Sequence, residues 1–473
     1  MSVLIDALTP LLGPETKYDG GQYPSSIPSC LVVRGKFVEV AKAMKKIHAL
    51  LVAEWAADET QFGRGFGIYA CYRWGPEYLI VKAEAPVEEP IFPTITEQYL
   101  PAYRFERQMR SLMGVVPVGH PDPRPWIKFE DWPEDAWPLR KTFNASETMP
   151  RVEGEYKWVR AEGVYEIPVG PVHAGIIEPG HFRFQAVGEG ILNLEERLGY
   201  VHKGIEKRFE ALSWQEGSRL AGRVSGDTTV AHSLAYCMAL ESMTGCGVPE
   251  RAYWLRALFL ERERIANHLG DIGAVCNDAA FAFMLYQMSR LKEIMLRTNL
   301  ELFGHRSIMD RVVPGGVSVD IGPEGKELIL SEMKKLLKEF NRLVAIYEEN
   351  ASLEDRVRDT GILIPEKARE ICAVGVVARA SGMNFDCRVQ NPFPPYDRIG
   401  VNVPVLIYGD VNARVYVRMK EVRESVRIIR EILQTLPDGN IVADCAIPAP
   451  DTAGFSTIEG WRGEIVYWLQ SGP

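Results

Sequence analysis

The chain has 473 residues, of which 46% are hydrophobic and 25% charged, and its net charge is −9. This length predicts two or three domains, and the composition is that of an ordinary soluble globular protein. The negative charge argues against nucleic acid as the main partner, because binding phosphates requires clustered lysine and arginine side chains. No secretory signal is visible, and no apolar stretch approaches the ~20 residues that span a bilayer. We therefore expect a cytoplasmic protein, which could still dock onto a membrane-embedded partner.

Eight cysteines are scattered along the chain, and no two of them are separated by two residues. A zinc or iron–sulfur site held by this chain alone is therefore not expected, because such sites use closely spaced cysteines. Without an export signal, a disulfide framework is not expected either. The pattern favours buried free thiols.

The first part of the chain mixes helical and strand patterns and is expected to form a small α/β module. Apolar residues at helical spacing predict helices, and runs of alternating or β-branched residues predict strands. In chain order we expect a helix over 38–54, strands over 67–74 and 78–83, and a helix over 96–113 that ends at Gly114.

Residues 114–141 are rich in proline, which donates no backbone hydrogen bond, so an extended arm is predicted there. The arm carries GHPDPR at 119–124 and PLRK at 138–141. These motifs resemble the signature of the small peripheral-arm subunit of respiratory complex I, its C-type subunit, although Ser111 and Met113 depart from it. The resemblance implies a C-like domain.

Beyond this domain the chain is predicted to be mainly helical. Apolar residues recur at helical intervals over 209–219, 230–243, 249–269, 280–303, 324–353 and 412–436. Segments of this length can pack as an antiparallel bundle. A strand-like run over 463–469 ends the pattern.

Several motifs in this second part are specific to one family. They include GPVHAGIIEPGHFRF at 170–184, RVSGDTTVAH at 223–232, LERERIANHLGDIG at 260–273 and WRGEIVYW at 461–468. The region resembles the large subunit of membrane-bound, energy-converting nickel–iron hydrogenases and the related D-type subunit of complex I. The fusion of a C-like module in front of a D-like one is similar to the large subunits of formate hydrogenlyase and hydrogenase-4.

The resemblance implies an α+β fold in three parts. We expect a C-like α/β domain with an extended arm over 1–143 and a polar linker over 144–164. A large, mainly α-helical bundle with a peripheral β-hairpin, like the hydrogenase large subunits and the D-type subunit of complex I, is expected over 165–473.

Catalytic members of that family hold nickel and iron with two CxxC pairs, because thiolates suit these metals. At the first pair this chain has Ser225 and Thr228, with Gly226 and Asp227 between them. The second pair does not occur before Pro473, and the sequence leaves open whether that residue is the natural end. The resemblance therefore implies that this chain holds no metal.

Complex I uses the vacated cavity for a quinone headgroup, which a hairpin histidine and a tyrosine bind as hydrogen-bond donors. Alignment on Ala231-His232 places Gly226 at the position of that tyrosine, so one donor is missing. Quinone remains a candidate ligand for a cavity at the vacated positions Ser225, Gly226, Asp227 and Thr228.

The hairpin keeps the hydrogenase form, with Glu178 between His173 and His181. The resemblance implies that Glu178 relays protons. The three side chains would then form a proton path or a polar cavity wall, and the alternative is that they only bind hairpin backbone. The Arg462 side chain is expected to reach the cavity. His232 is expected to support the cavity wall without binding a ligand directly.

Three further local predictions follow from spacing. Asp227 is interpreted as the N-cap of the helix that begins near Val230, with a role as a hard metal ligand or proton acceptor as the alternative. Arg306 and Asp310, four residues apart, are predicted to form an ion pair. The run from Glu261 to Arg264 is predicted to be a solvated or intersubunit face.

The leading hypothesis is a hydrogenase-like, metal-free subunit of a membrane-associated oxidoreductase complex related to complex I, the NADH:quinone oxidoreductase. It would receive electrons from a small iron–sulfur subunit and couple them to ion translocation by antiporter-like membrane subunits on the inner face of the cell membrane. One alternative is a non-catalytic scaffold of that complex. A working nickel–iron hydrogenase is disfavoured because the first cysteine pair is lost inside the chain.

Overall fold

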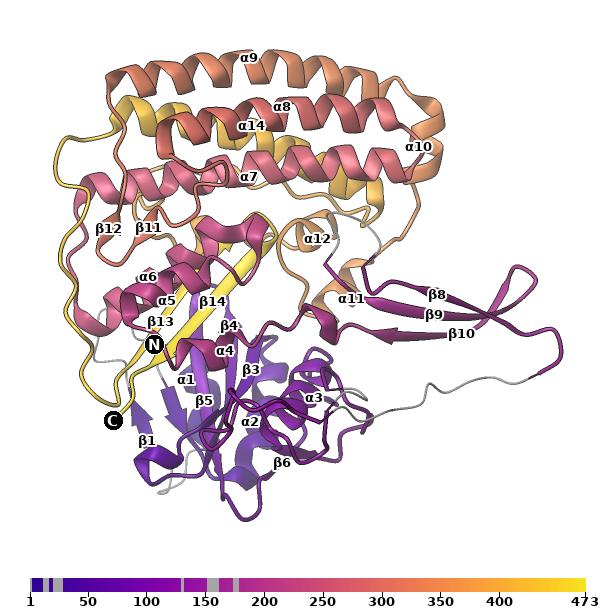
Figure 1. The fold of residues 1–473 in the computed structure, drawn as a ribbon, viewed down its shortest axis with the longest axis vertical. Helices are drawn as coiled ribbons and strands as arrows, with labels where there is room; N and C mark the ends of the chain where they lie inside the picture. Colours follow the sequence, from indigo (N-terminus) through magenta and orange to yellow (C-terminus); the bar gives the residue numbers. More distant parts are fainter. Residues whose placement is uncertain (1, 12–16, 20–28, 129–131, 151–160, 173–177) are drawn as a thin grey trace. The chain divides into compact units, whose positions relative to one another are not determined.

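The structure is a computed structural model that describes residues 2–11, 17–19, 29–128, 132–150, 161–172 and 178–473. It divides into two compact units (Figure 1). The first holds the described residues of Met1–Asp19 and Pro28–Ala211, and the second holds Leu212–Pro473. The first contains the larger sheets and the second is mainly helical with a terminal strand hairpin, so the predicted α+β class is confirmed. Among the described residues, no helix is both long and apolar enough to cross a membrane.

A five-stranded sheet forms the core of the first unit, in the order β1-β2-β5-β4-β3. Its strands are β1 (Lys17–Asp19), β2 (Ser29–Leu31), β3 (Leu50–Asp58), β4 (Phe66–Trp74) and β5 (Glu77–Ala85). Strands β2 and β5 are parallel, and the other neighbours are antiparallel. Every residue of β4 except its last is buried, so both faces of this inner strand are covered. Helix α1 (Val3–Leu8) contacts β4 and β5, and α3 (Ala102–Met113) contacts β3.

The helix predicted over 38–54 is too long, because the chain changes to strand after residue 46. Helix α2 spans Phe37–Lys46, and His48 then takes a φ of 60°. The Ala49 N–H donates to the Met44 carbonyl at 3.0 Å, which closes the helix in the manner of a left-handed C-terminal motif. The apolar residues that continue the helical spacing therefore belong to β3.

The second predicted helix begins later than its apolar spacing indicates. Helix α3 starts at Ala102, and the preceding loop is tied to the Glu106 side chain, which accepts from the Ile95 N–H at 2.7 Å. Gly114 ends the helix with a φ of 68°, as predicted. Strands β6 (Ile91–Pro93) and β7 (Val116–Val118) form a short parallel pair.

A separate three-stranded antiparallel sheet in the first unit carries the hairpin motif. Its strands are β8 (Tyr165–Val169), β9 (His181–Val187) and β10 (Gly190–Arg197), with β9 in the middle. The short helix α4 (Ile205–Phe209) follows.

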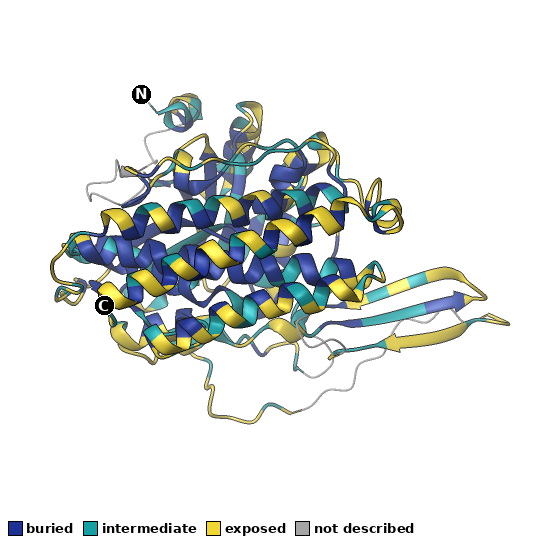
Figure 2. Cartoon of the chain, turned by 90° about the horizontal axis from the view of Figure 1, so that it is seen from above, coloured by how far each residue is buried: buried dark blue, intermediate teal, exposed yellow. Residues whose placement is uncertain are grey.

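The second unit is built around four long helices that run side by side (Figure 1). These are α7 (Glu250–Asp278), α8 (Ala282–Phe303), α9 (Pro323–Glu348) and α14 (Val411–Thr435). The shorter helices are α5 (Trp214–Ala221), α6 (Thr229–Thr244), α10 (Ala351–Val357), α11 (Pro365–Glu370), α12 (Gly375–Ala380) and α13 (Cys387–Gln390). Figure 2 shows buried and exposed residues alternating along the outer long helices, which is the pattern of a bundle.

Two hairpins complete this unit. Strands β11 (Val312–Val313) and β12 (Gly316–Val317) form a short antiparallel hairpin. In the second hairpin, β13 (Ala453–Gly460) pairs with β14 (Gly463–Gln470). The second hairpin packs against α6. A Cβ at Gly454 would lie 2.2 Å from the Ala239 carbonyl oxygen, so only glycine allows this close packing.

Two predicted helices are each divided by a helix cap. In the 209–219 segment, Ser213 and Glu216 form a capping box that starts α5. In the 324–353 segment, α9 ends at Glu348, and the Asn350 side chain caps α10 by accepting from the Leu353 N–H at 3.0 Å. Short polar side chains that satisfy free backbone N–H groups favour a new helix start over continuation.

The predicted ion pair between Arg306 and Asp310 is wrong. Helix α8 ends at Phe303, and Asp310 has a φ of 63°, so a separation of four residues does not place the two side chains together. Arg306 instead pairs with Glu293 at 2.5 Å, and Asp310 pairs with Arg223.

The expectation that all cysteines are free thiols is also wrong for two of them. Cys246, just after α6, is joined to Cys445 by a disulfide, with 5.3 Å between their Cα atoms. The partners are 199 residues apart, so no local pattern indicates the pair. Five of the six other cysteines are buried.

Candidate functional site

The turn that precedes α6 carries Ser225 and Thr228, which the sequence motif predicts to stand at the positions of the first hydrogenase cysteine pair. Ser225 comes just before the 3₁₀ turn Gly226–Thr228. The hydroxyls of Ser225 and Thr228 each donate to Oδ1 of Asp227 at 2.7 Å. Both hydroxyls therefore donate their hydrogen bonds to the same carboxylate.

The tip of the β13–β14 hairpin closes on this turn. The Arg462 guanidinium donates to Oδ2 of Asp227 at 2.5 Å, and it stacks over the Trp461 ring at 4.4 Å. The indole N–H of Trp461 donates to the Asp227 carbonyl and to the Thr228 hydroxyl, both at 3.1 Å. The Arg462 and Asp227 side chains are 53% and 31% exposed, so this charged pair is accessible from solvent.

Helix α6 is capped by a residue of α7, not by Asp227, so the predicted N-cap role of Asp227 is wrong. The Glu263 carboxylate accepts from the Val230 N–H at 2.7 Å and from the Ala231 N–H at 3.1 Å. Burial, with a smaller contribution from the charge of Asp227, raises the pKa of Glu263 to about 8. A buried carboxyl with such a pKa can hold a proton at neutral pH.

Two more side chains of the long helices interact with the turn, one by a hydrogen bond and one through its charge, and both were missed from the sequence. Asn267 donates to the Asp227 carbonyl at 2.6 Å. Burial lowers the pKa of Lys292 on α8, while the charges of Asp227 and Asp271 raise it. Asp227 thus lies among an arginine, a lysine and a buried acid, which is an arrangement suited to proton exchange.

His232 lies one turn into α6 and faces the second strand of the hairpin. Its Nδ1 is 3.3 Å from the Tyr467 hydroxyl, and the two rings meet edge to face at 5.9 Å. Tyr467 also contacts Tyr236 edge to face. Tyr467 could have been suspected only from its place five residues after Arg462 in the family motif.

The hairpin residues of the motif belong to the first unit, whereas 225–232 and Arg462 belong to the second. Glu178 is 48% exposed, and its carboxylate lies 3.7 Å from the Lys203 ammonium. His181 is buried at the start of β9, where its Nε2 accepts from Arg183 at 2.9 Å. His173 lies outside the described residues.

The run from Glu261 to Arg264 is buried, so its prediction as a solvated face is wrong. All four side chains are at most 8% exposed, because α7 is packed by α8 and α14. Arg262, for example, binds Glu332 at 2.7 Å and Asn299 at 2.6 Å. The apolar residues on every side of α7 are the sequence signal for such a buried helix.

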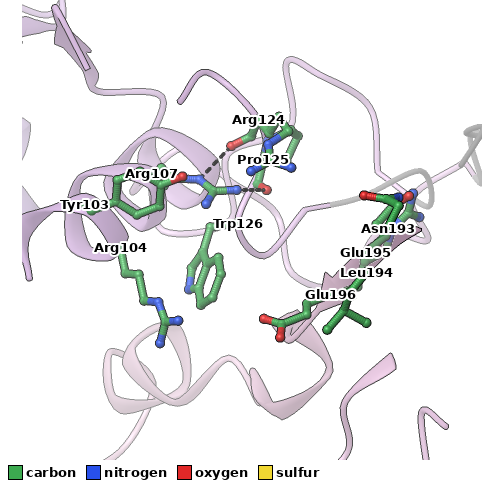
Figure 3. A pocket seen from close by; sticks show the side chains of 11 residues that line it. Tyr103, Arg104, Arg107, Arg124, Pro125, Trp126, Asn193, Leu194, Glu195 and Glu196 are labelled. Carbon is green, nitrogen blue, oxygen red and sulfur yellow. Dashed lines mark hydrogen bonds and ion pairs between the residues drawn. The ribbon is translucent and has the colours of Figure 1, made fainter. Parts of the chain in front are cut away.

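A cavity of about 470 Å³ lies in the first unit (Figure 3). One wall is formed by Tyr103, Arg104 and Trp126, and the other by residues 193–197 of β10. Arg107 donates to the carbonyls of Arg124 and Pro125 at 3.0 and 2.9 Å, which fixes the arm beside Trp126 (Figure 3). None of the predicted site residues that the structure describes lines this cavity.

The residues at the 225–228 turn do not fit a nickel–iron centre. Soft thiolates suit these metals, whereas both hydroxyls here are neutral and already donate their protons to Asp227. In the described parts of the chain, no group of three or more His, Cys, Asp or Glu side chains is placed to hold a metal ion.

Comparison with known proteins identifies both parts of the chain. Residues 30–149 match the family described as "Respiratory-chain NADH dehydrogenase, 30 Kd subunit", and residues 278–471 match "Respiratory-chain NADH dehydrogenase, 49 Kd subunit". Formate hydrogenlyase subunit 5 of Escherichia coli (strain K12) is 32% identical over 84% of this chain and 71% of its own length.

Two other similar proteins belong to respiratory complexes. The C/D subunit of NADH-quinone oxidoreductase from Phocaeicola vulgatus is 29% identical over 81% of this chain and 78% of its own length. A chain from the structure of the membrane-bound sulfane sulfur reductase, an archaeal respiratory membrane complex, has a TM-score of 0.61 and 25% identity, covering 66% of this chain and 86% of that one.

These matches confirm the resemblance inferred from the motifs. The protein is a subunit of a membrane-bound complex of the hydrogenase or complex I type. The chain belongs to the family of the 30 and 49 kDa subunits of respiratory-chain NADH dehydrogenase and the related large subunits of membrane-bound hydrogenases, and it joins the two subunit types in one polypeptide.

Proposed function

We propose that this subunit transfers electrons from an iron–sulfur partner subunit to an acceptor at the 225–228 turn, without a metal centre of its own. The observation that carries this proposal is the bonding of Ser225 and Thr228 to Asp227, which is in turn paired with Arg462. The turn has exchanged metal ligands for a carboxylate, two hydroxyls and an exposed cation. Such groups can orient an organic acceptor and supply protons to it.

A quinone headgroup is the acceptor that these groups suit best. Its reduction to a quinol takes two electrons, which the iron–sulfur partner supplies, and two protons. Arg462 can stabilise negative charge that develops on a quinone oxygen, and Asp227 with Glu263 can pass protons toward it. Nothing among the described residues lies within 4 Å of the position that a Cβ would take at Gly226, so the backbone is open to a ligand there.

A sulfane sulfur compound is the second candidate acceptor. The observation that favours it is the likeness to one chain of the sulfane sulfur reductase structure, and the match covers 86% of that chain. Reducing a sulfur–sulfur bond also takes two electrons and two protons, so the same polar groups would serve. Turnover assays with each acceptor separate the two candidates.

The hairpin is proposed to bring protons to this reaction. Glu178 is half exposed and close to Lys203, so it can exchange protons with water, and His181 and His173 stand on either side of it in the sequence. We place the subunit on the inner face of the cell membrane, held there by antiporter-like membrane subunits. The support is that its relatives are named as hydrogenases and quinone oxidoreductases, and that the solved relative is a membrane complex.

Asp227→Asn tests the acceptor site. We expect a fall of about 100-fold in acceptor reduction by the assembled complex, because the amide cannot take or give a proton at this position. The free energy of unfolding should change by no more than about 1 kcal/mol, since the pair with Arg462 is solvent-accessible. Asp278→Asn, at an exposed carboxylate at the end of α7, is the matched control and should be neutral.

Two outcomes would contradict this proposal. If Asp227→Asn assembles normally and turns over like the wild type, the protein is a scaffold at this site. If the purified complex contains stoichiometric nickel bound to this chain, the metal-free interpretation fails.

Glu178→Gln tests the hairpin part of the proposal independently. We expect turnover to fall by about tenfold or more and to become more dependent on pH, because one exchangeable carboxyl of the proton route is removed. Glu189→Gln, at the exposed turn between β9 and β10, is the control. Identical turnover and pH profile in Glu178→Gln and the wild type would show that Glu178 only shapes the hairpin.

A further inference from the structure

A cluster of charged side chains lies buried inside the second unit, where α7, α12, α13, α14 and β13 contribute. Its cations are Arg264, Arg379 and Arg388, each at most 2% exposed. Its acids are Glu261, Asp386, Glu421 and Glu459, each at most 1% exposed. We name these seven residues the buried charge cluster.

Arg388 compensates two of the four acids. It binds both oxygens of Asp386, at 3.0 and 2.7 Å, and it reaches Glu261 at 3.0 Å. Glu261 also accepts from the hydroxyls of Tyr396 and Ser425 at 2.6 and 2.5 Å. Burial opposes ionisation of Glu261, but the charges of the nearby arginines and these bonds lower its pKa. Both acids are therefore stabilised as carboxylates.

Arg379 is shared by the remaining acids. Its Nε donates to Glu421 at 2.9 Å, and its Nη1 donates to Glu459 at 2.7 Å. The same Nη1 lies 3.6 Å from Asp386. Arg264 contributes less, because it lies 3.5 Å from Glu261 and 3.6 Å from Glu421. One guanidinium therefore serves three carboxylates.

The charges of the cluster do not balance. Three arginines face four carboxylates, so the fully ionised cluster would carry one net negative charge inside the protein. A buried charge without compensation is strongly unfavourable, and the usual response is to bind a proton. One proton must therefore be held by the cluster or by its neighbour His268.

His268 is poorly placed to hold that proton. Its Nε2 lies 2.8 Å from Glu421, and its buried Nδ1 has no hydrogen-bond partner in the described part of the chain. A protonated imidazole would have an N–H at Nδ1 without an acceptor, whereas the neutral ring needs none there. Burial lowers the pKa of His268, Glu421 raises it, and Arg264 and Arg418 lower it further. His268 is thus neutral and donates from Nε2 to Glu421.

Glu459 is the least compensated acid of the cluster. Among the described residues, its carboxylate accepts only from Arg379, which is shared, and from the Cys387 N–H at 3.1 Å. Arg264 binds the backbone carbonyls of Glu459 and Gly460, at 2.6 and 3.0 Å, and not the Glu459 carboxylate. Burial, followed by the charge of Asp386, raises the pKa of Glu459 to about 7, against the opposite effects of Arg379 and Arg264.

We propose that Glu459 is a buried proton-binding site, which takes up and releases a single proton that balances the buried charge cluster. This inference goes beyond the proposed function and does not depend on it. The position of Glu459 in the chain links this proton to the hairpin tip. Glu459 lies two residues before Trp461 and three before Arg462. A change of charge at Glu459 would be felt at the hairpin tip that holds the 225–228 turn.

Proton counting on the full-length chain tests the proposal. The wild type and Glu459→Gln are titrated without buffer from about pH 5 to about pH 9, and the variant should release one proton fewer. Glu293→Gln is the control and should release as many protons as the wild type, because Arg306 and Arg297 lower the pKa of Glu293 to about 2.

A second variant keeps the test decisive if Glu459→Gln does not fold. Glu421→Gln leaves three arginines with three carboxylates, so the charge balances when Glu459 is ionised. We then expect the proton to leave at a pH lower by about one unit or more. Equal proton release by Glu459→Gln and the wild type, or an unchanged midpoint in Glu421→Gln, overturns the proposal. Release that depends on sodium or potassium would show that a metal cation balances the cluster, which also overturns it.

Discussion

Replacing Arg379 by methionine is expected to lower the free energy of unfolding by about 3–5 kcal/mol. Arg379 is fully buried and donates to both Glu421 and Glu459, at 2.9 and 2.7 Å. Methionine fills a similar volume but leaves these carboxylates without their cation, and a buried carboxylate without a partner is much more costly than a buried pair. Chemical denaturation followed by circular dichroism measures the loss.

The matched control for Arg379→Met is Arg342→Met on α9. Arg342 is 63% exposed and pairs with Glu339 one turn away, so its loss should change stability by no more than about 0.5 kcal/mol. Arg379→Lys is expected to lie between the two, because an ammonium keeps the charge but cannot bridge the carboxylates as a planar guanidinium does. A loss below about 1 kcal/mol in Arg379→Met would show that water or structural relaxation already solvates the cluster.

Helices were predicted well where the apolar spacing runs unbroken and no polar side chain within the segment caps a new helix. Helix α8 was expected over 280–303 and is observed at Ala282–Phe303. The predictions failed where a local side chain competes with the periodicity, as Ser213 and Asn350 do by capping new helices. Apolar spacing does not show which backbone N–H groups a neighbouring polar side chain satisfies.

The turn at 225–228 was singled out in the sequence because the resemblance implies that Ser225 and Thr228 stand at cysteine positions, and this correspondence stays a prediction. The contacts that hold the site in place could not be predicted from the sequence. Glu263 acts on a helix more than thirty residues earlier, and Glu261 meets Arg388 at a separation of 127 residues. A run of alternating charges has the same local sequence whether water or a distant arginine compensates its charges. The burial of this run could therefore not be predicted without the fold.

Replacing Glu263 by glutamine is expected to flatten the dependence of stability on pH. The pKa of this carboxyl is raised from 4.5 to about 8 by burial, so folding favours its protonated form. Its contribution to stability is complete below about pH 4.5 and is lost as pH rises toward about pH 8, because the folded protein binds more protons than the unfolded chain in that range. The linkage corresponds to at most about 4–5 kcal/mol.

Free energies of unfolding at a series of pH values measure this effect as the difference between the wild type and Glu263→Gln. The wild type should lose stability relative to the variant as pH rises from about 5 to about 8, since glutamine cannot ionise. At the acid end the variant should be weaker by about 1 kcal/mol, because one of the bonds to the Val230 and Ala231 N–H groups loses its acceptor. Glu250→Gln is the control, because Arg398 and then Trp254 lower the pKa of Glu250 by hydrogen bonding and its curve should run parallel to the wild type. Parallel curves for Glu263→Gln would mean that Glu263 is ionised in the fold and caps α6 as a carboxylate.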